Sequence, residues 1–257
     1  MSFSRSLKAC GTPLYGRTPQ SPRLATIRSS ATIAARFAAF ALMTVLAAVM
    51  AADAPAVTQI RGRMDQAAAK FLQMSADVKR ITHTAVLNED SVESGSVRMR
   101  RLPSGEIQGL VELTAPDHKL YSFEKRKLRI YTPAINTVQE FDLGQHGEQL
   151  DEFLSIGFGT SGKELAKGYE VDVLADNKMP QTTRVKLIPR DDEVKKYLTR
   201  IDLWITDQNY PIQEKLWEPS KDYIVVSYSS VQINPNLSAD AFTLHTAPNP
   251  KVEYPQR

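Results

Sequence analysis

The sequence predicts an α+β fold, in which a strongly curved antiparallel sheet has helices held against one face. Three observations predict this class. An early segment has apolar residues at helical spacing, roughly ten later segments alternate between polar and apolar residues, and a second helical stretch lies in the middle of the chain. Most of the alternating segments follow one another through short turns, without the intervening helices that a parallel sheet requires.

The first 52 residues form a leader that precedes this fold. They contain no acidic residue, are rich in Arg, Ser and Thr, and end in an apolar block from Phe37 to Ala52. This pattern is typical of a signal peptide, here with cleavage near residues 51–56, after Ala51 or Ala56. An uncleaved anchor, an organellar transit peptide and a start codon placed too early are the alternatives. We expect residues 53–257 to be one exported domain, without repeats or linkers.

The composition of residues 53–257 excludes several classes of function. The whole chain has a formal net charge of +3, but every charged residue of the leader is basic, so the domain that follows is slightly acidic. Nucleic-acid binding needs a basic surface that neutralises phosphates, so we expect no nucleic-acid partner. The single cysteine, Cys10, lies in the leader. The domain therefore has no disulfide, thiolate nucleophile or cysteine-ligated metal.

The first element of the domain is predicted to be an amphipathic helix from Thr58 to about Ala76. Charged residues separate its apolar residues, which recur at helical spacing: Ile60, Met64, Ala67, Phe71, Met74 and Val78. From Ile81 onward the period changes to that of half-buried strands. Alternation is clear around 97–101, 107–113 and 128–130, and turn-forming residues separate these segments.

The middle of the chain is predicted to be helical again, before the strands resume. One apolar stripe there consists of Leu150, Phe153, Leu154 and Phe158, and Gly157 and Gly159 interrupt it. The strands that follow are expected at 169–174, 182–189, 199–206, 212–218 and 223–232.

Motifs that would indicate catalysis are not convincing in this sequence. Residues 157–162 match the glycine pattern of a dinucleotide site, but a helical stripe precedes them where such a site needs a strand. Ser161 and Glu164 instead predict a capping box, and Gly168 a left-handed stop, for a short helix. The four histidines lack metal-ligand spacing, and no serine lies in a nucleophile elbow. We therefore expect a binding protein rather than an enzyme, with no cofactor and no metal.

Several sequence blocks between about Phe71 and Leu244 form a recognisable series. They are Ser94–Pro103, Thr114–Asp117, Leu128–Val138, Ile201–Ile205 with Tyr210-Pro211-Ile212, Val231–Leu237 and Phe242-Thr243-Leu244. The Ile-Asn-Pro-x-Leu run at 233–237, followed by Phe-x-Leu, is the most specific of these signals. Together these blocks resemble the periplasmic lipoprotein carrier (LolA-like) family, which includes outer-membrane lipoprotein-sorting proteins.

The resemblance implies an incomplete (half) β-barrel closed by helices. It also implies a carrier that binds acyl chains of lipoproteins, or other lipids, in an apolar cavity and shuttles them across the periplasm toward the outer membrane. An inner-membrane release complex and an outer-membrane acceptor would be its partners. Related proteins of this architecture act as sensors, so a lipid-sensing or regulatory module that works through a protein partner is the alternative.

The candidate ligand-binding residues fall into a sheet face, a lid and a latch. The concave sheet face is expected to hold the chains with Met99, Val111, Leu113, Ile130 and Trp204. The stripe Leu150, Phe153, Leu154 and Phe158 would be a movable plug, hinged near Gly157 and Gly159. Arg101, matched to the family's arginine, would tie the closed lid through hydrogen bonds to backbone carbonyls, or support the end of its strand.

Overall fold

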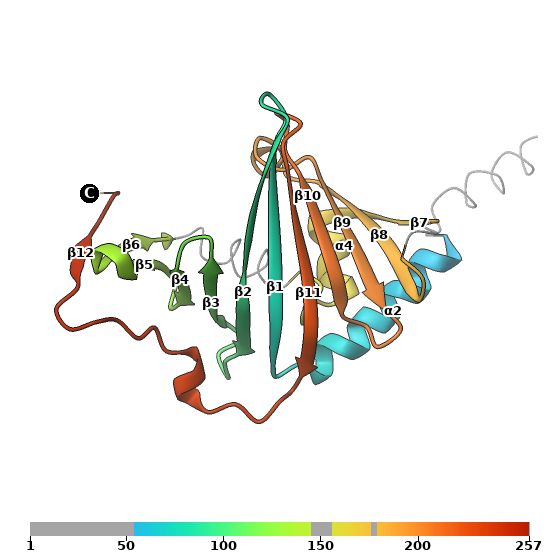
Figure 1. Cartoon of the computed structure of the whole chain (residues 1–257). Helices are drawn as coiled ribbons and strands as arrows, with labels where there is room; N and C mark the ends of the chain where they lie inside the picture. The colour runs from blue at the N-terminus through green and yellow to red at the C-terminus, as the bar shows by residue number, and fades with distance from the viewer. Residues whose placement is uncertain (1–53, 145–155, 176–178, 257) are drawn as a thin grey trace, which may run out of the picture. The chain divides into compact units, whose positions relative to one another are not determined.

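The computed structural model describes residues 54–144, 156–175 and 179–256, which fall within one compact unit, Asp53–Arg257. The predicted leader lies outside these residues and stays a prediction. Figure 1 shows one large sheet with a few helices. Its strands are β1 (Gln73–Thr84), β2 (Glu89–Arg101), β3 (Ile107–Ala115), β4 (Lys119–Glu124), β5 (Lys127–Thr132), β6 (Thr137–Asp142), β7 (Tyr169–Leu174), β8 (Thr182–Pro189), β9 (Arg200–Thr206), β10 (Pro211–Trp217), β11 (Tyr223–Ile233) and β12 (Lys251–Glu253).

The helices are short apart from the first. They are α2 (Pro55–Lys70), α4 (Gly162–Gly168), α5 (Asp192–Lys195) and the 3-10 turns η1 (Pro133–Ile135) and η3 (Ala239–Phe242). Across the described ranges, none of the helices is both long enough and apolar enough to cross a membrane.

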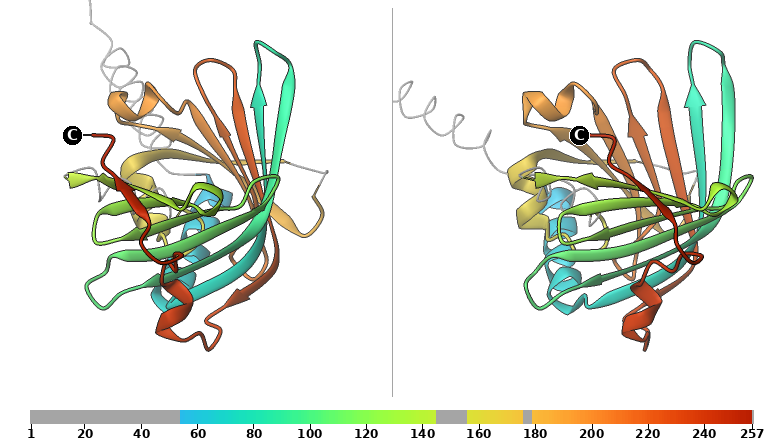
Figure 2. Two further views of the ribbon diagram at one scale, coloured as in Figure 1. Left: turned by 60° about the vertical axis from the view of Figure 1, so that its left-hand side comes forward. Right: turned by 90° about the vertical axis from the view of Figure 1, so that its left-hand side faces the viewer.

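The sheet is 12-stranded and open, in the order β12-β6-β5-β4-β3-β2-β1-β11-β10-β9-β8-β7. Every neighbouring pair is antiparallel except β12 with β6, which run parallel. The prediction of a mostly antiparallel sheet with helices is confirmed, but the strong curvature and half-barrel are not. The sheet twists but is neither strongly curled nor closed (Figure 2). Among the described strands, each edge strand pairs on one side, β12 with β6 and β7 with β8.

The N-terminal helix begins earlier and ends earlier than predicted. Helix α2 has a proline in its first turn, where the missing N–H costs nothing, and it buries Val57, Ile60 and Met64. It ends at Lys70, because Gln73–Thr84 forms β1 between β2 and β11. In this segment Met74, Ala76 and Val78 also fit the two-residue period of a strand. The segment fits both the helical period and the strand period. Its hydrogen bonds to strands on both sides select the strand.

The short helix α4 follows the glycine-rich segment. The predicted capping box is present, because the Ser161 hydroxyl accepts from the Glu164 amide and the Glu164 carboxylate accepts from the Ser161 amide. The prediction for Gly168 is wrong: it is the last helical residue, and Tyr169 continues directly into β7 with extended backbone. Of the predicted apolar stripe, Leu150, Phe153 and Leu154 lie outside the described residues.

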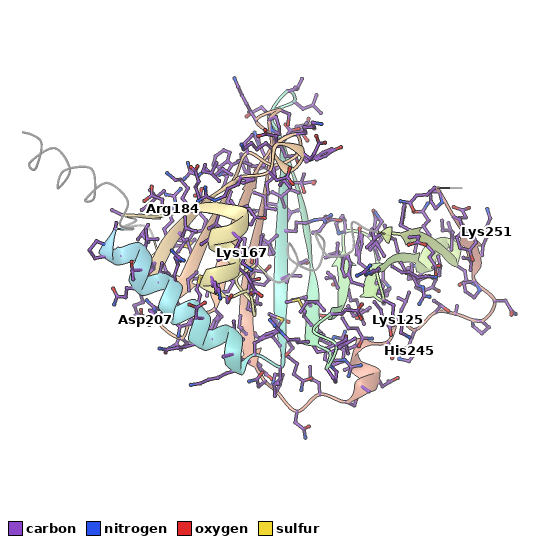
Figure 3. All side chains as sticks on the ribbon, turned by 180° about the vertical axis from the view of Figure 1, so that it is seen from behind. Lys125, Lys167, Arg184, Asp207, His245 and Lys251 are labelled. Carbon is purple, nitrogen blue, oxygen red and sulfur yellow. The ribbon has the colours of Figure 1, made fainter. Side chains whose placement is uncertain are left out.

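Both faces of the sheet bury apolar side chains. Helices α2 and α4 lie over one face, as Figure 3 shows from behind, and there Ile60, Met64 and Leu165 pack on β7–β10. The opposite face of β3–β6 buries a second cluster against Leu244 of the C-terminal segment. That segment also buries Phe242 completely beneath the Arg100 guanidinium, 4.6 Å from the ring centre. We refer to the face under α2 and α4 as the helix face.

Candidate functional site: an apolar cavity on the helix face

A cavity of about 260 Å³ lies on the helix face where the middle strands meet. Alternate residues of six strands line it, together with one residue from the segment before α4. The lining residues are Met74, Val78, Arg80, Val97, Met99, Ile107, Gly109, Val111, Leu113, Tyr121, Phe123, Phe158, Glu214, Leu216, Ile224, Val226 and Tyr228. Nearly all of them are apolar, so the cavity suits a hydrocarbon.

The strand register brings these residues together from distant parts of the chain. Met74 of β1 is opposite Met99 of β2, and Val97 of β2 is opposite Val111 of β3. Val111 is in turn opposite Tyr121 of β4. Because side chains alternate along a strand, each such row lies on a single face. The strand register therefore determines which side chains form the floor of the cavity.

Phe158 covers one end of the cavity. Its ring is 3% exposed and meets the Tyr228 ring edge-on, with the centroids 5.0 Å apart at 81°. The flanking glycines have left-handed backbone, with φ +82° at Gly157 and +93° at Gly159. A Cβ at Gly159 would come within 2.6 Å of the Phe71 ring. Glycine is thus needed at both positions to turn Phe158 inward. We call residues 156–160 the cover segment.

Arg101 connects the end of β2 to the cover segment. Its Nη2 donates a hydrogen bond to the Gly159 carbonyl, and its Nε is buried without a hydrogen-bond partner in the described structure. Its amide donates to the Leu72 carbonyl at 2.8 Å. The side chain therefore contacts a backbone carbonyl beside Phe158, the type of contact expected of a latch.

The other candidate residues take different positions. Met99, Val111, Leu113 and Phe158 line the cavity. Ile130 is opposite Tyr121, one strand beyond the cavity lining. Trp204 projects from the other face of β9, because its neighbour Leu203 occupies the helix face, and the Arg184 guanidinium lies 4.9 Å from the Trp204 ring.

The sequence analysis missed two polar residues of the cavity, Glu214 and Tyr228. They come from the neighbouring strands β10 and β11, and each side chain shifts the pKa of the other. Burial raises the pKa of Glu214 from 4.5 to about 8, which outweighs the opposite effect of Tyr228. Burial also raises the pKa of Tyr228, and Glu214 adds to that shift. A sequence signal existed, since Glu214 takes the place of an apolar residue between Ile212 and Leu216.

The raised pKa of Glu214 should make stability depend on pH. Between pH 4.5 and about 8 the unfolded chain has lost this proton while the folded protein keeps it. The free energy of unfolding should therefore fall as pH rises through this window. Urea denaturation at several pH values should show that slope, and Glu214→Gln should flatten it.

Glu140→Gln supplies a control of opposite sign. Hydrogen bonds from Lys127 and Arg129 lower the pKa of Glu140, so its stabilising contribution is lost as pH falls below 4.5. That variant should leave the slope between pH 4.5 and 8 as it is in the unmodified protein. An equal slope in the Glu214→Gln variant would contradict the assignment.

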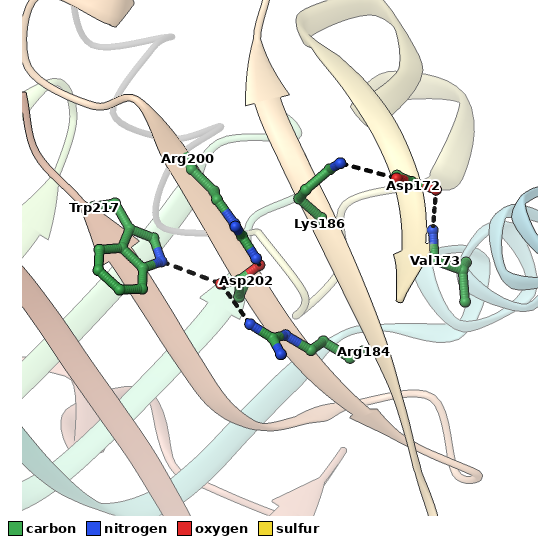
Figure 4. Close-up of polar contacts among 7 residues, drawn as sticks. All are labelled: Asp172, Val173, Arg184, Lys186, Arg200, Asp202 and Trp217. Atoms are coloured by element: carbon green, nitrogen blue, oxygen red, sulfur yellow. Dashed lines mark hydrogen bonds and ion pairs between the residues drawn. The ribbon is translucent and has the colours of Figure 1, made fainter. Parts of the chain in front are cut away.

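A separate polar cluster lies on the other face of the sheet. Asp202 is fully buried and accepts hydrogen bonds from Arg184 at 3.2 Å, Arg200 at 2.8 Å and the Trp217 indole at 3.1 Å (Figure 4). Its hydrogen bonds with these partners indicate a structural role. Among the described residues, no group of three or more His, Cys, Asp or Glu side chains is placed to hold a metal ion.

Comparison with known proteins gives likenesses in structure only. No protein-family model and no curated protein matches the chain. Among solved structures, MucB is 10% identical, with 75% of this chain and 64% of MucB covered at a TM-score of 0.48. This chain thus matches less than two thirds of the length of MucB.

Two further solved structures cover nearly their whole length. A putative outer-membrane lipoprotein-sorting protein domain from Vibrio parahaemolyticus is 14% identical, with 72% of this chain and 94% of that chain covered at a TM-score of 0.39. A LolA superfamily protein from Nitrosomonas europaea is 13% identical, with 73% and 97% covered at a TM-score of 0.38. LolA-superfamily and lipoprotein-sorting proteins, which the sequence blocks resemble, are thus among the structural neighbours of this chain, at low identity.

Proposed function

We propose that this protein is an exported carrier that binds acyl chains of lipoproteins, or of other lipids, and shuttles them across the periplasm toward the outer membrane. The observation that carries the proposal is the apolar cavity on the helix face, with the Phe158 ring at one end. Release from an inner-membrane complex and delivery to an outer-membrane acceptor are part of the same proposal.

The energetics of acyl chains explain why such a cavity is useful. Each methylene moved from water to an apolar environment gains about 0.8 kcal/mol, so a chain of about fifteen methylenes is held in a membrane by roughly 12 kcal/mol. Transfer through water alone is correspondingly slow. A protein interior that replaces the membrane environment makes loading and release nearly balanced exchanges. No covalent chemistry is needed at the carrier.

The cavity must widen to hold a long chain. Its volume of about 260 Å³ lies just below the roughly 300–1,000 Å³ of typical ligand pockets. In this proposal the cover segment moves out, Phe158 leaves the cavity end, and Arg101 releases the Gly159 carbonyl. The left-handed glycines on either side of Phe158 serve as the hinges.

Displacement of the fluorescent dye N-phenyl-1-naphthylamine by unbranched acyl methyl esters tests acyl binding. Affinity should rise about fourfold per added methylene, the equivalent of about 0.8 kcal/mol, until the cavity is full. Val111→Asp should weaken binding at least tenfold, because it adds an unpaired charge to an apolar cavity. Glu112→Gln, next along β3 but on the other face, should have no effect. Affinity independent of chain length would contradict the proposal.

A second candidate function is a lipid-sensing or regulatory module that acts through a protein partner. The turn between β1 and β2 favours it, because Val86 is 89% exposed and Leu87 is 64% exposed at the tip of this hairpin. Exposed apolar side chains at a projecting tip suit a contact with another macromolecule. This candidate predicts a stable protein complex and little transfer of acyl chains.

A further inference from the structure

Two polar side chains from neighbouring strands lie in the mostly apolar cavity. Glu214 and Tyr228 both line it, and both are partly accessible from within it. A polar group in an apolar cavity costs free energy unless it forms hydrogen bonds. A carboxyl group and a phenol each offer more than one hydrogen-bonding position, so the neighbouring Glu214 and Tyr228 retain bonding capacity for a ligand.

Among the described lining residues, none offers a free positive charge to a Glu214 carboxylate. Arg80 is the one basic residue among the lining residues, and its guanidinium is bound to Glu93 of β2, with Nε 2.7 Å from the carboxylate. Burial is the dominant influence on the pKa of Glu214, and Tyr228 acts in the opposite direction. The carboxyl group is therefore mostly neutral at pH 7, and its neutral form carries an O–H donor.

The pair lies at the covered end of the cavity. Gly157 is its neighbour in the cover segment, since a Cβ placed there would be 3.5 Å from Oε1 of Glu214. The Phe158 ring contacts Tyr228 directly. From this end, the apolar lining continues across β1, β2 and β3 to Phe123 of β4. With strands about 4.8 Å apart, β10 and β4 are separated by roughly 24 Å along the sheet.

We propose that Glu214 and Tyr228 form a head-group subsite, and that the cavity prefers an uncharged acyl compound whose ester or amide carbonyl accepts a hydrogen bond from this pair. The proposal rests on the proposed acyl-binding function and adds the chemical class of the head group. The hydrocarbon tail would extend from the subsite along the apolar lining toward β4. The carbonyl would lie beside Gly157, under the cover segment.

Other head groups fit the subsite less well. A carboxylate would bring a negative charge into a cavity whose single arginine is already paired. An ammonium would require Glu214 to ionise, and the desolvation of both charges would offset their attraction. A bare hydrocarbon would leave the bonding capacity of the pair unused. The ester or amide carbonyl accepts the O–H without adding a charge.

Three compounds with the same twelve-carbon chain test the subsite: methyl dodecanoate, dodecane and dodecylammonium. Each is measured by displacement of N-phenyl-1-naphthylamine from the full domain at pH 7. The ester should bind three- to tenfold more tightly than dodecane, as one net hydrogen bond predicts. Glu214→Leu should abolish this difference, and Glu214→Gln, which keeps a donor, should retain most of it. Glu140→Gln, on another part of the sheet, should behave like the unmodified protein.

The outcomes separate this proposal from the proposed function. Displacement by dodecane and ester with equal affinity would overturn the subsite and leave acyl binding intact. Tightest binding of dodecylammonium would also overturn it, in favour of a cationic head group. Retention of the ester preference in Glu214→Leu, with a thermal melt showing a folded domain, would overturn the role of Glu214. If none of the three compounds displaces the dye, the proposed acyl-binding function is contradicted, and so is the subsite that depends on it.

Discussion

Replacement of Asp202 with alanine should lower the free energy of unfolding by about 3 kcal/mol, the low end of the cost of breaking a buried ion pair. The carboxylate has no exposed surface, and it accepts hydrogen bonds from Arg184, Arg200 and Trp217. Removal leaves two guanidinium groups close together without their common partner. Both arginine side chains are about a quarter to a third exposed, which is why we expect the low end of the range.

Asp172→Ala is the matched control for Asp202→Ala. Its carboxylate pairs with Lys186 at 2.8 Å on the neighbouring strands, but the Asp172 side chain is 50% exposed. Exposed pairs contribute at most about 1 kcal/mol. Urea denaturation of both variants measures the difference, and in thermal melts a loss of about 3 kcal/mol corresponds to roughly 6–12 °C. Equal losses in the two variants would contradict a structural role for the buried carboxylate.

Replacement of Phe158 with alanine should change stability and dye binding in opposite directions. The ring is nearly fully buried among Phe71, Met99 and Tyr228. Removal of a buried phenylalanine costs about 3–5 kcal/mol, because a cavity replaces its contacts. The same space becomes available to a ligand without displacement of the ring. The free energy of unfolding should therefore fall by about 3 kcal/mol while the affinity for N-phenyl-1-naphthylamine rises.

Phe242→Ala separates the two effects. Phe242 is fully buried, but it lies in the C-terminal segment beneath Arg100 and does not line the cavity. Its removal should cost a similar free energy of unfolding and leave dye affinity unchanged. An equal gain of affinity in both variants would mean that general loosening of the protein, and not the space left by Phe158, admits the dye.

The strands of the C-terminal half were predictable because local signals agree with tertiary pairing. Alternation over 182–189 and 169–174 coincides with β8 and β7, and turn residues separate the strands. The N-terminal helix was predicted too long, because Phe71 and Met74 fit both helical and strand periods. Only the pairing of β1 with strands far away in sequence selects the extended form. Whether a sheet stays open at its edges is likewise a property of the whole sheet, so no short sequence segment predicts it.

The cavity was predictable in part for the same reason. Met99, Val111 and Leu113 were identifiable from alternation within β2 and β3, and they share the lining. Alternation alone does not say which face of a given strand meets the cavity, and Trp204 accordingly lies on the other face. The pairing of Glu214 with Tyr228 needs the β10–β11 register, in which Glu214 is opposite Val226. That register depends on the folded sheet.

The position of β1 at the middle of the sheet has a consequence for the order of folding. This first strand is bonded on one side to its sequence neighbour β2 and on the other to β11, with Met74 opposite Ile233. Closing a loop over so long an intervening chain costs conformational entropy. Contacts between residues far apart in sequence therefore slow folding. The strand pairing that joins the two halves of the sheet can therefore form only after β11 has been synthesised.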